Sequence, residues 1–135
     1  MLLRKASGQR RVLVNEPAIA ASLAARGFRV VDPMTSSAAE IVDACLDARV
    51  LFGIEGSHLT HGFLPMDPGA TVFTLQPPFK LDLFWRDRCN AIGARYAMLI
   101  GDEVEGGFRI DPDRLNRALD RVLEEAPRFP QRARA

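Results

Sequence analysis

Apolar and polar positions along this chain follow two periods, one typical of strands and one typical of helices. Short apolar runs that predict buried strands lie at 2–3, 12–14, 28–31, 50–54, 70–75 and 95–100. Between most of these runs, apolar residues recur three or four positions apart, which predicts helices. We expect helices from Asn15 to Gly27, from Ser37 onward, from Ser57 onward, from about Lys80 to Gly93, and from Asp111 onward. Alternating strands and helices predict an α/β fold, with a Rossmann-like parallel sheet covered by helices on both faces.

The starts of these helices carry recognisable capping residues. Asn15 suits an N-cap, and Glu16 adds a favourable charge in the first turn. Ser37 and Glu40 have the spacing of a capping box, while Asp111 precedes a proline at the first helical position. The apolar helix faces are predicted to form the core, including the adjacent aromatic residues at positions 84 and 85.

The segment from Val50 to Gly62 organises the rest of the prediction. An apolar strand passes through Gly53 and Gly56 and then opens a helix at Ser57. The first turn of a helix presents unpaired N–H groups and a partial positive charge, which suit an anion and most often a phosphate. On spacing alone, a strand that simply turns into a helix is the favoured interpretation. The segment lacks the third glycine of a dinucleotide fingerprint and the Lys-Ser/Thr pair of a Walker loop.

Composition narrows the class of protein. The chain has 135 residues, 47% of them hydrophobic and 26% charged, which fits one globular domain. We place that domain at 1–126 and expect the Arg-rich end at 127–135 to be a loose tail. The balance of 18 Lys+Arg against 17 Asp+Glu gives no reason to expect nucleic acid as a partner. No apolar run reaches the ~18 residues of a membrane span, so we expect a cytoplasmic protein.

Several polar residues near the predicted strand ends are candidates for binding. Arg4 and Arg11 are the two ends of a polar connection, residues 4–11, that contains four cations and no acid. This connection is either a solvated loop or an anion contact. Glu55 either caps the helix at Ser57 or accepts hydrogen bonds from ligand hydroxyls. His58 and His61 are three residues apart and share a helix face. Without a third ligand, donor contact or packing is favoured over a metal site for this pair.

The order of these signals resembles glycosyltransferase family 61, which includes bacterial capsular polysaccharide biosynthesis proteins. The family's central loop usually reads Gly-x-His-Gly-Ala-Gly-Leu-Thr-Asn, and residues 53–61 here read Gly-Ile-Glu-Gly-Ser-His-Leu-Thr-His. The resemblance extends to about Tyr96. The matching residues are Arg4, Arg11, Asn15, Glu16, Gly27, Phe28, Val30, Val31, Glu40, Ala48, Gly53, Gly56, Leu59, Thr60, Pro77 and Pro78.

The resemblance implies a GT-B arrangement in which this chain is the C-terminal half and binds a nucleotide-sugar donor without a metal ion. A glycan would be the acceptor. The other half would be a separate N-terminal domain, or the chain would self-associate. Catalytic residues are not assigned. Alternatives are a non-catalytic remnant, an interaction domain, or another Rossmann-like nucleotide binder. The expected donor-binding residues are Arg4, Arg11, Asn15, Glu16, Glu55, Gly56, Ser57, His58, Thr60 and His61.

Overall fold

The computed structural model describes residues 1–4 and 11–126. Most of the predicted basic connection, residues 5–10, and the predicted tail at 127–135 lie outside the described residues, so the domain boundary at 126 stays a prediction. The elements in chain order are α1 (Glu16–Ala25), α2 (Ala38–Cys45), β1 (Val50–Ile54), the 3-10 turn η1 (Ser57–Leu59), α3 (Thr60–Phe63), β2 (Thr71–Gln76), α4 (Phe84–Ile92), β3 (Arg95–Ile100), β4 (Asp102–Val104), β5 (Gly107–Arg109) and α5 (Pro112–Glu125).

The central sheet is parallel, with β1, β2 and β3 side by side in that order. Leu2 extends it, because it forms parallel bridges to both Val31 and Gly53. The Leu2 amide donates to the Phe52 carbonyl at 2.9 Å, and the Leu3 amide donates to the Val31 carbonyl at 2.9 Å. Numbered along the chain, the five segments therefore lie in the order 2-1-3-4-5, one of the two common doubly wound arrangements. The predicted strands at 2–3 and 28–31 are present only as these single bridges.

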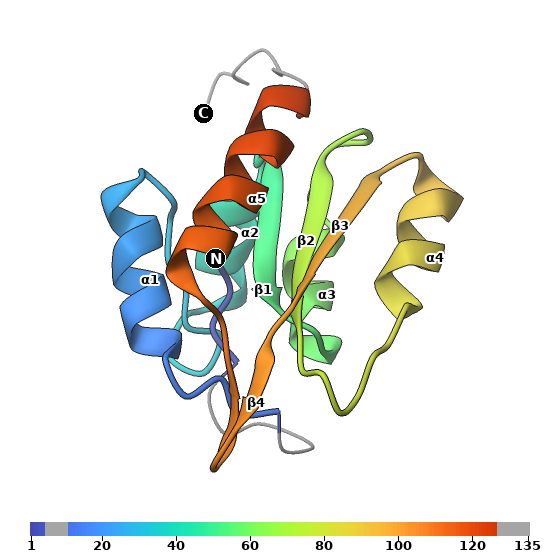
Figure 1. Cartoon of the computed structure of the whole chain (residues 1–135). Helices are drawn as coiled ribbons and strands as arrows, with labels where there is room; N and C mark the ends of the chain where they lie inside the picture. The colour runs from blue at the N-terminus through green and yellow to red at the C-terminus, as the bar shows by residue number, and fades with distance from the viewer. Residues whose placement is uncertain (5–10, 127–135) are drawn as a thin grey trace.

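Helices cover both faces of the sheet, as the alternation of the sequence predicts. Leu23 of α1 and Leu119 of α5 share one core with Phe52 of β1. On the opposite face, Trp85 of α4 shares a second core with Leu51, the neighbour of Phe52 along the same strand. Figure 1 shows α1 and α5 on one side of the strands and α3 and α4 on the other. The α/β class is confirmed, whereas the equivalence to half of a GT-B enzyme stays a prediction.

Three of the predicted helix boundaries are confirmed by local hydrogen bonds and backbone geometry. The Ser37 hydroxyl accepts from the Glu40 amide at 3.3 Å, and a Glu40 carboxylate oxygen accepts from the Ser37 amide at 2.7 Å. The Asp111 carboxylate accepts from the Arg114 amide at 2.7 Å at the start of α5. Gly27 follows α1 with φ +84°, a left-handed conformation that favours glycine.

Helix α4 begins at Phe84, about four residues later than the apolar pattern predicts. The preceding segment is held as a loop by the side chain of Gln76, which donates to the Asp82 carbonyl at 2.6 Å and accepts from the Asp82 amide at 3.3 Å. Trp85 is 1% exposed, but Phe84 is 45% exposed. The prediction of two core aromatic residues is therefore right for Trp85 and wrong for Phe84.

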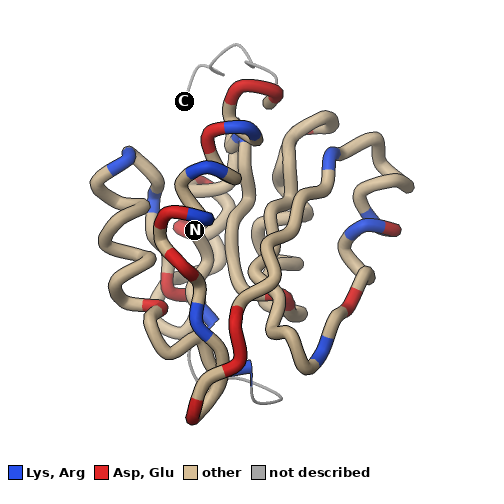
Figure 2. Tube along the Cα trace, in the orientation of Figure 1, with Lys and Arg blue, Asp and Glu red and all other residues tan. Residues whose placement is uncertain are grey.

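A hairpin of β4 and β5, absent from the prediction, follows β3 at the carboxyl end of the sheet (Figure 1). Leu13 forms a parallel bridge to Phe108 of β5, so the predicted strand at 12–14 belongs to this small second sheet. Gly107 has to be glycine here, since a Cβ would lie 2.1 Å from the Val12 carbonyl oxygen. Basic and acidic residues alternate along α5 and occur on several other elements (Figure 2). None of the described helices is both long and apolar enough to cross a bilayer.

Candidate functional site

A cavity of about 370 Å³ lies where the carboxyl ends of three parallel segments meet. Doubly wound sheets bind ligands at this place, because the chain leaves neighbouring strands in opposite directions and opens a crevice. Arg4 follows the Leu2 segment, and the residues after β1 form the facing wall. Four of the ten predicted binding residues therefore come together. The lining residues are Leu3, Arg4, Pro33, Met34, Ser57, His58 and His61.

The wall after β1 is built from two short turns instead of one long helix. Gly56 has φ +155° and ψ 168°, and η1 and α3 together cover only 57–63. A 3-10 turn and a single α turn align few peptide dipoles, so the predicted helix dipole contributes little at this site. Within the described residues, the amides of Ser57 and His58 donate to no backbone carbonyl. The charge that the cavity offers an anion comes mainly from side chains.

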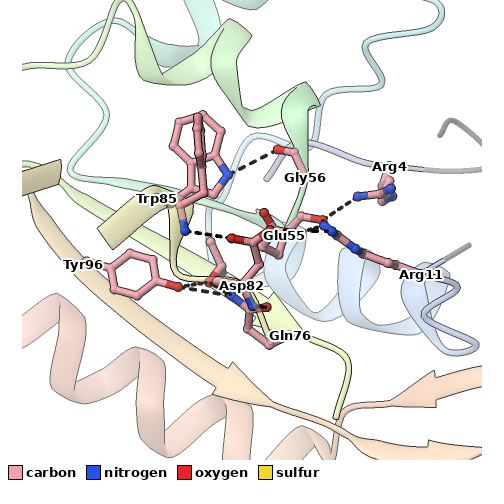
Figure 3. Close-up of polar contacts among 10 residues, drawn as sticks. Arg4, Arg11, Glu55, Gly56, Gln76, Asp82, Trp85 and Tyr96 are labelled. Atoms are coloured by element: carbon pink, nitrogen blue, oxygen red, sulfur yellow. Dashed lines mark hydrogen bonds and ion pairs between the residues drawn. The ribbon is translucent and has the colours of Figure 1, made fainter. Parts of the chain in front are cut away.

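Two arginines hold the chain at Glu55 (Figure 3). Both Arg4 and Arg11 donate to the Glu55 carbonyl oxygen, Arg11 at 2.9 Å. The Arg11 guanidinium also forms an ion pair with the Glu55 carboxylate, and the two side chains are 8% and 4% exposed. Asp82 approaches the same guanidinium at 3.9 Å. The turn at Ser57 has no side-chain cap, so the interpretation of Glu55 as a cap is wrong, and its carboxylate serves an internal ion pair.

The other predicted binding residues lie away from the cavity wall. The Glu16 carboxylate accepts from the Arg4 amide at 3.0 Å. Asn15 occupies the N-cap position of α1, but its side chain makes no cap bond and instead bonds the Ile110 carbonyl at 2.9 Å and the Ile110 amide at 3.3 Å. Thr60 is exposed on α3. These contacts connect the start of α1 to Arg4 and to the segment before α5, and a direct ligand contact by any of the three stays a prediction.

The two histidines give the cavity imidazole groups beside a fixed cation. Burial, with the positive charge of Arg4 acting in the same direction, lowers the pKa of His58 to about 4. His58 is therefore neutral at pH 7, when it donates from one ring nitrogen and accepts at the other. Together with the Arg4 guanidinium and the Ser57 hydroxyl, this set of groups suits a phosphate or another oxyanion. Across residues 1–4 and 11–126, no three His, Cys, Asp or Glu side chains form a metal-binding group.

The buried His58 predicts a stability profile that can be measured. Because its folded-state pKa of about 4 lies below the ordinary value of 6.5, the unfolded chain binds a proton first as the pH falls. His58 thus favours the folded state fully above pH 6.5, and this contribution declines between pH 6.5 and about 4. His58→Gln should flatten the free energy of unfolding in that window, measured by urea unfolding at a series of pH values. An unchanged slope would contradict the neutral buried state.

The doubly wound fold and its switch-point cavity define a class of α/β domains that bind ligands at this edge of the sheet. Within that class, the Glycosyltransferase 61 family matches residues 1–73, a segment that contains Arg4, α1, α2, β1 and the turns that carry both histidines. The chain belongs to the glycosyltransferase 61 family. No significant match was found among curated proteins or among solved structures.

Sequence reasoning missed three residues of the cavity wall, Leu3, Pro33 and Met34. Pro33 and Met34 follow the predicted strand at 28–31, so they occupy the same edge of the sheet as the loop after β1. The sequence signal that could have identified Pro33 and Met34 is their position directly after a predicted strand. It identifies the two residues only when the order of the strands is known, because Val31 must lie beside Leu2 for Met34 to reach the cavity.

Proposed function

We propose that this chain is the donor-binding part of a glycosyltransferase and that its cavity holds the diphosphate of a nucleotide sugar. The observation that carries the proposal is the cavity at the switch point, lined by Arg4, Ser57, His58 and His61, in a chain that belongs to a glycosyltransferase family. The acceptor would be a glycan in capsular or cell-surface polysaccharide synthesis, and the reaction would take place in the cytoplasm.

The chemistry required of this half is the stabilisation of a leaving group. Transfer of the sugar breaks its bond to the diphosphate, and negative charge develops on the departing phosphate oxygen. The Arg4 guanidinium is held in place by its bond to the Glu55 carbonyl, so it can meet that charge without reorganising. We propose that this cation, with donors from Ser57 and His61, stabilises the leaving group. A base for the acceptor hydroxyl would come from a second domain or a second chain.

Nucleotide binding tests the proposal directly. We expect isothermal titration calorimetry with uridine diphosphate or another nucleoside diphosphate to show binding, because the cavity offers a cation and several hydrogen-bond donors. His61→Ala should weaken that affinity roughly 3- to 10-fold, the value of one hydrogen bond. His61 is exposed, so the thermal unfolding midpoint of the His61→Ala variant should equal that of the parent.

The matched control is Leu64→Ala. Leu64 follows α3 immediately, is 77% exposed and does not line the cavity. This variant should bind like the parent. The absence of heat with every nucleoside diphosphate would remove the donor-binding proposal. Equal affinity for a nucleoside monophosphate and a diphosphate would instead favour another kind of nucleotide binder.

One observation favours the second candidate, a non-catalytic or interaction domain that retains the family fold. Glu55, the acidic residue of the central loop, is 3% exposed and occupied by Arg11, so it offers no charge to a substrate. If the folded chain bound no nucleoside diphosphate, the result would support this non-catalytic or interaction domain.

A further inference from the structure

The outer edge of β3 is a strand edge that the described chain leaves open. Within residues 1–4 and 11–126, β3 pairs only with β2. Every residue of β2 is buried, whereas Met98 and Ile100 of β3 are 39% and 38% exposed. Figure 1 looks toward this edge and shows β3 in front of the other strands, between α5 and α4.

The backbone groups that point outward can be assigned from the register. The amides of Arg95 and Gly101 donate to β2-side carbonyls, at 2.8 and 2.9 Å. Because successive residues of a strand alternate in direction, Tyr96, Met98 and Ile100 direct their N–H and C=O groups to the open edge. The Ile100 carbonyl accepts from Arg114 at 3.2 Å, which protects one end of the edge. The strand has neither the proline nor the lysine with which natural edges are commonly blocked.

Charge along this edge is polarised from one end to the other. Arg95 opens the strand and pairs with Glu125 of its own chain. The hairpin that follows carries three exposed acids, Asp102, Glu103 and Glu105, and of these Asp102 pairs with Arg114. Figure 2 shows a blue segment near the start of β3 and red segments along the hairpin. An identical strand that lies antiparallel to β3 would therefore bring its basic end to the acidic end of its neighbour.

We propose that two copies of this chain associate through their β3 edges, in antiparallel orientation and about a twofold axis. Hydrogen bonds form only where outward-facing residues of the two strands lie opposite each other. A twofold axis that passes through Met98 meets this condition, because it places Met98 opposite Met98 and Tyr96 opposite Ile100 of the second copy. Arg95 then lies opposite Gly101 of the second copy and next to its Asp102. The two sheets become one continuous sheet, and the exposed Met98 and Ile100 side chains are covered. This surface is separate from the cavity, so the inference does not depend on the proposed function.

Sedimentation velocity of the full chain over a wide concentration range tests the dimer. The parent should dimerise reversibly, and Met98→Pro should raise the dissociation constant at least about tenfold. Proline removes an outward N–H in each copy and none that bonds β2, so the monomer fold should persist. Should this variant fail to fold, Met98→Lys places a charge on the edge and serves the same purpose. The matched control Met98→Leu should dimerise like the parent.

Charge reversal provides an independent test of the orientation. Arg95→Glu alone and Asp102→Arg alone should each weaken association, and the double variant should regain at least part of it. Within one chain the double variant loses its ion pairs with Glu125 and Arg114, so regained association can arise only between copies. A parent that stays monomeric, a dimer insensitive to Met98→Pro or Met98→Lys, or a double variant weaker than both singles would overturn the proposal.

Discussion

Replacing Arg11 with leucine is expected to lower the free energy of unfolding by about 3–5 kcal/mol. Glu55 is 3% exposed, and its carboxylate is paired with the Arg11 guanidinium. Removing the cation leaves a charge in the protein interior without its counter-charge, and the Glu55 carbonyl loses one of its two arginine donors. Both losses affect Glu55, the residue that connects β1 to the turn that carries Ser57 and His58.

Urea unfolding of three variants separates the ion pair from simple loss of packing. Arg11→Leu with Glu55→Leu should recover most of the lost stability, because an apolar pair of similar size needs no charge compensation. The matched control is Arg86→Leu, since Arg86 pairs with Asp87 at 3.3 Å on the surface, and its removal should cost within about 0.5 kcal/mol. A double variant less stable than Arg11→Leu alone would contradict the interpretation of a buried ion pair.

Gly56→Ala is expected to cost about 2–4 kcal/mol and to abolish nucleoside diphosphate binding. Its φ of +155° lies in a region that side-chain-bearing residues rarely adopt. A Cβ at this position would lie 2.0 Å from an Arg4 guanidinium nitrogen, so Arg4 has to leave the Glu55 carbonyl and the cavity wall. The substitution therefore strains the backbone and also removes the cation from the proposed phosphate site.

Gly27→Ala isolates the backbone component of this effect. Gly27 has φ +84°, and a Cβ there would meet nothing within 4 Å, so alanine should cost only about 1–2 kcal/mol. Gly27→Ala should also retain nucleotide affinity, as measured by calorimetry on the folded variants. Binding by Gly56→Ala at parent affinity would show that Arg4 is not needed where we place it.

The elements that the sequence predicted well are those with local signals. β1, β2 and β3 are short segments rich in apolar, β-branched and aromatic residues, and α2 and α5 have capping residues that bond as expected. The segments around Leu2 and Val31 pair only as single bridges. Pro33 explains part of this, because it has no N–H for a ladder and ends the second segment. The β4–β5 hairpin has a Gly106-Gly107 turn signal, but its acidic flank, Asp-Glu-Val, does not follow a strand pattern.

The candidate site was predicted to the extent that it depends on sequence position at strand ends. Arg4, Ser57, His58 and His61 were all expected there and all line the cavity. The pairing of Arg11 with Glu55 was not predicted, because it joins residues 44 positions apart and depends on how the Leu2 segment enters the sheet. The direction of a side chain at a strand end depends on how the strands are ordered and packed, and the sequence pattern does not give that order.

The indole of Trp85 can report the conformation of the turn at Gly56 through its fluorescence. It is the single tryptophan of the chain, is 1% exposed, and donates to the Gly56 carbonyl at 3.3 Å. Any event that displaces Gly56, such as occupation of the neighbouring hollow by a nucleotide, alters the polarity and hydrogen bonding around that ring. Intrinsic fluorescence therefore reports on this turn without an attached dye, and the chain carries its own spectroscopic probe of ligand occupancy.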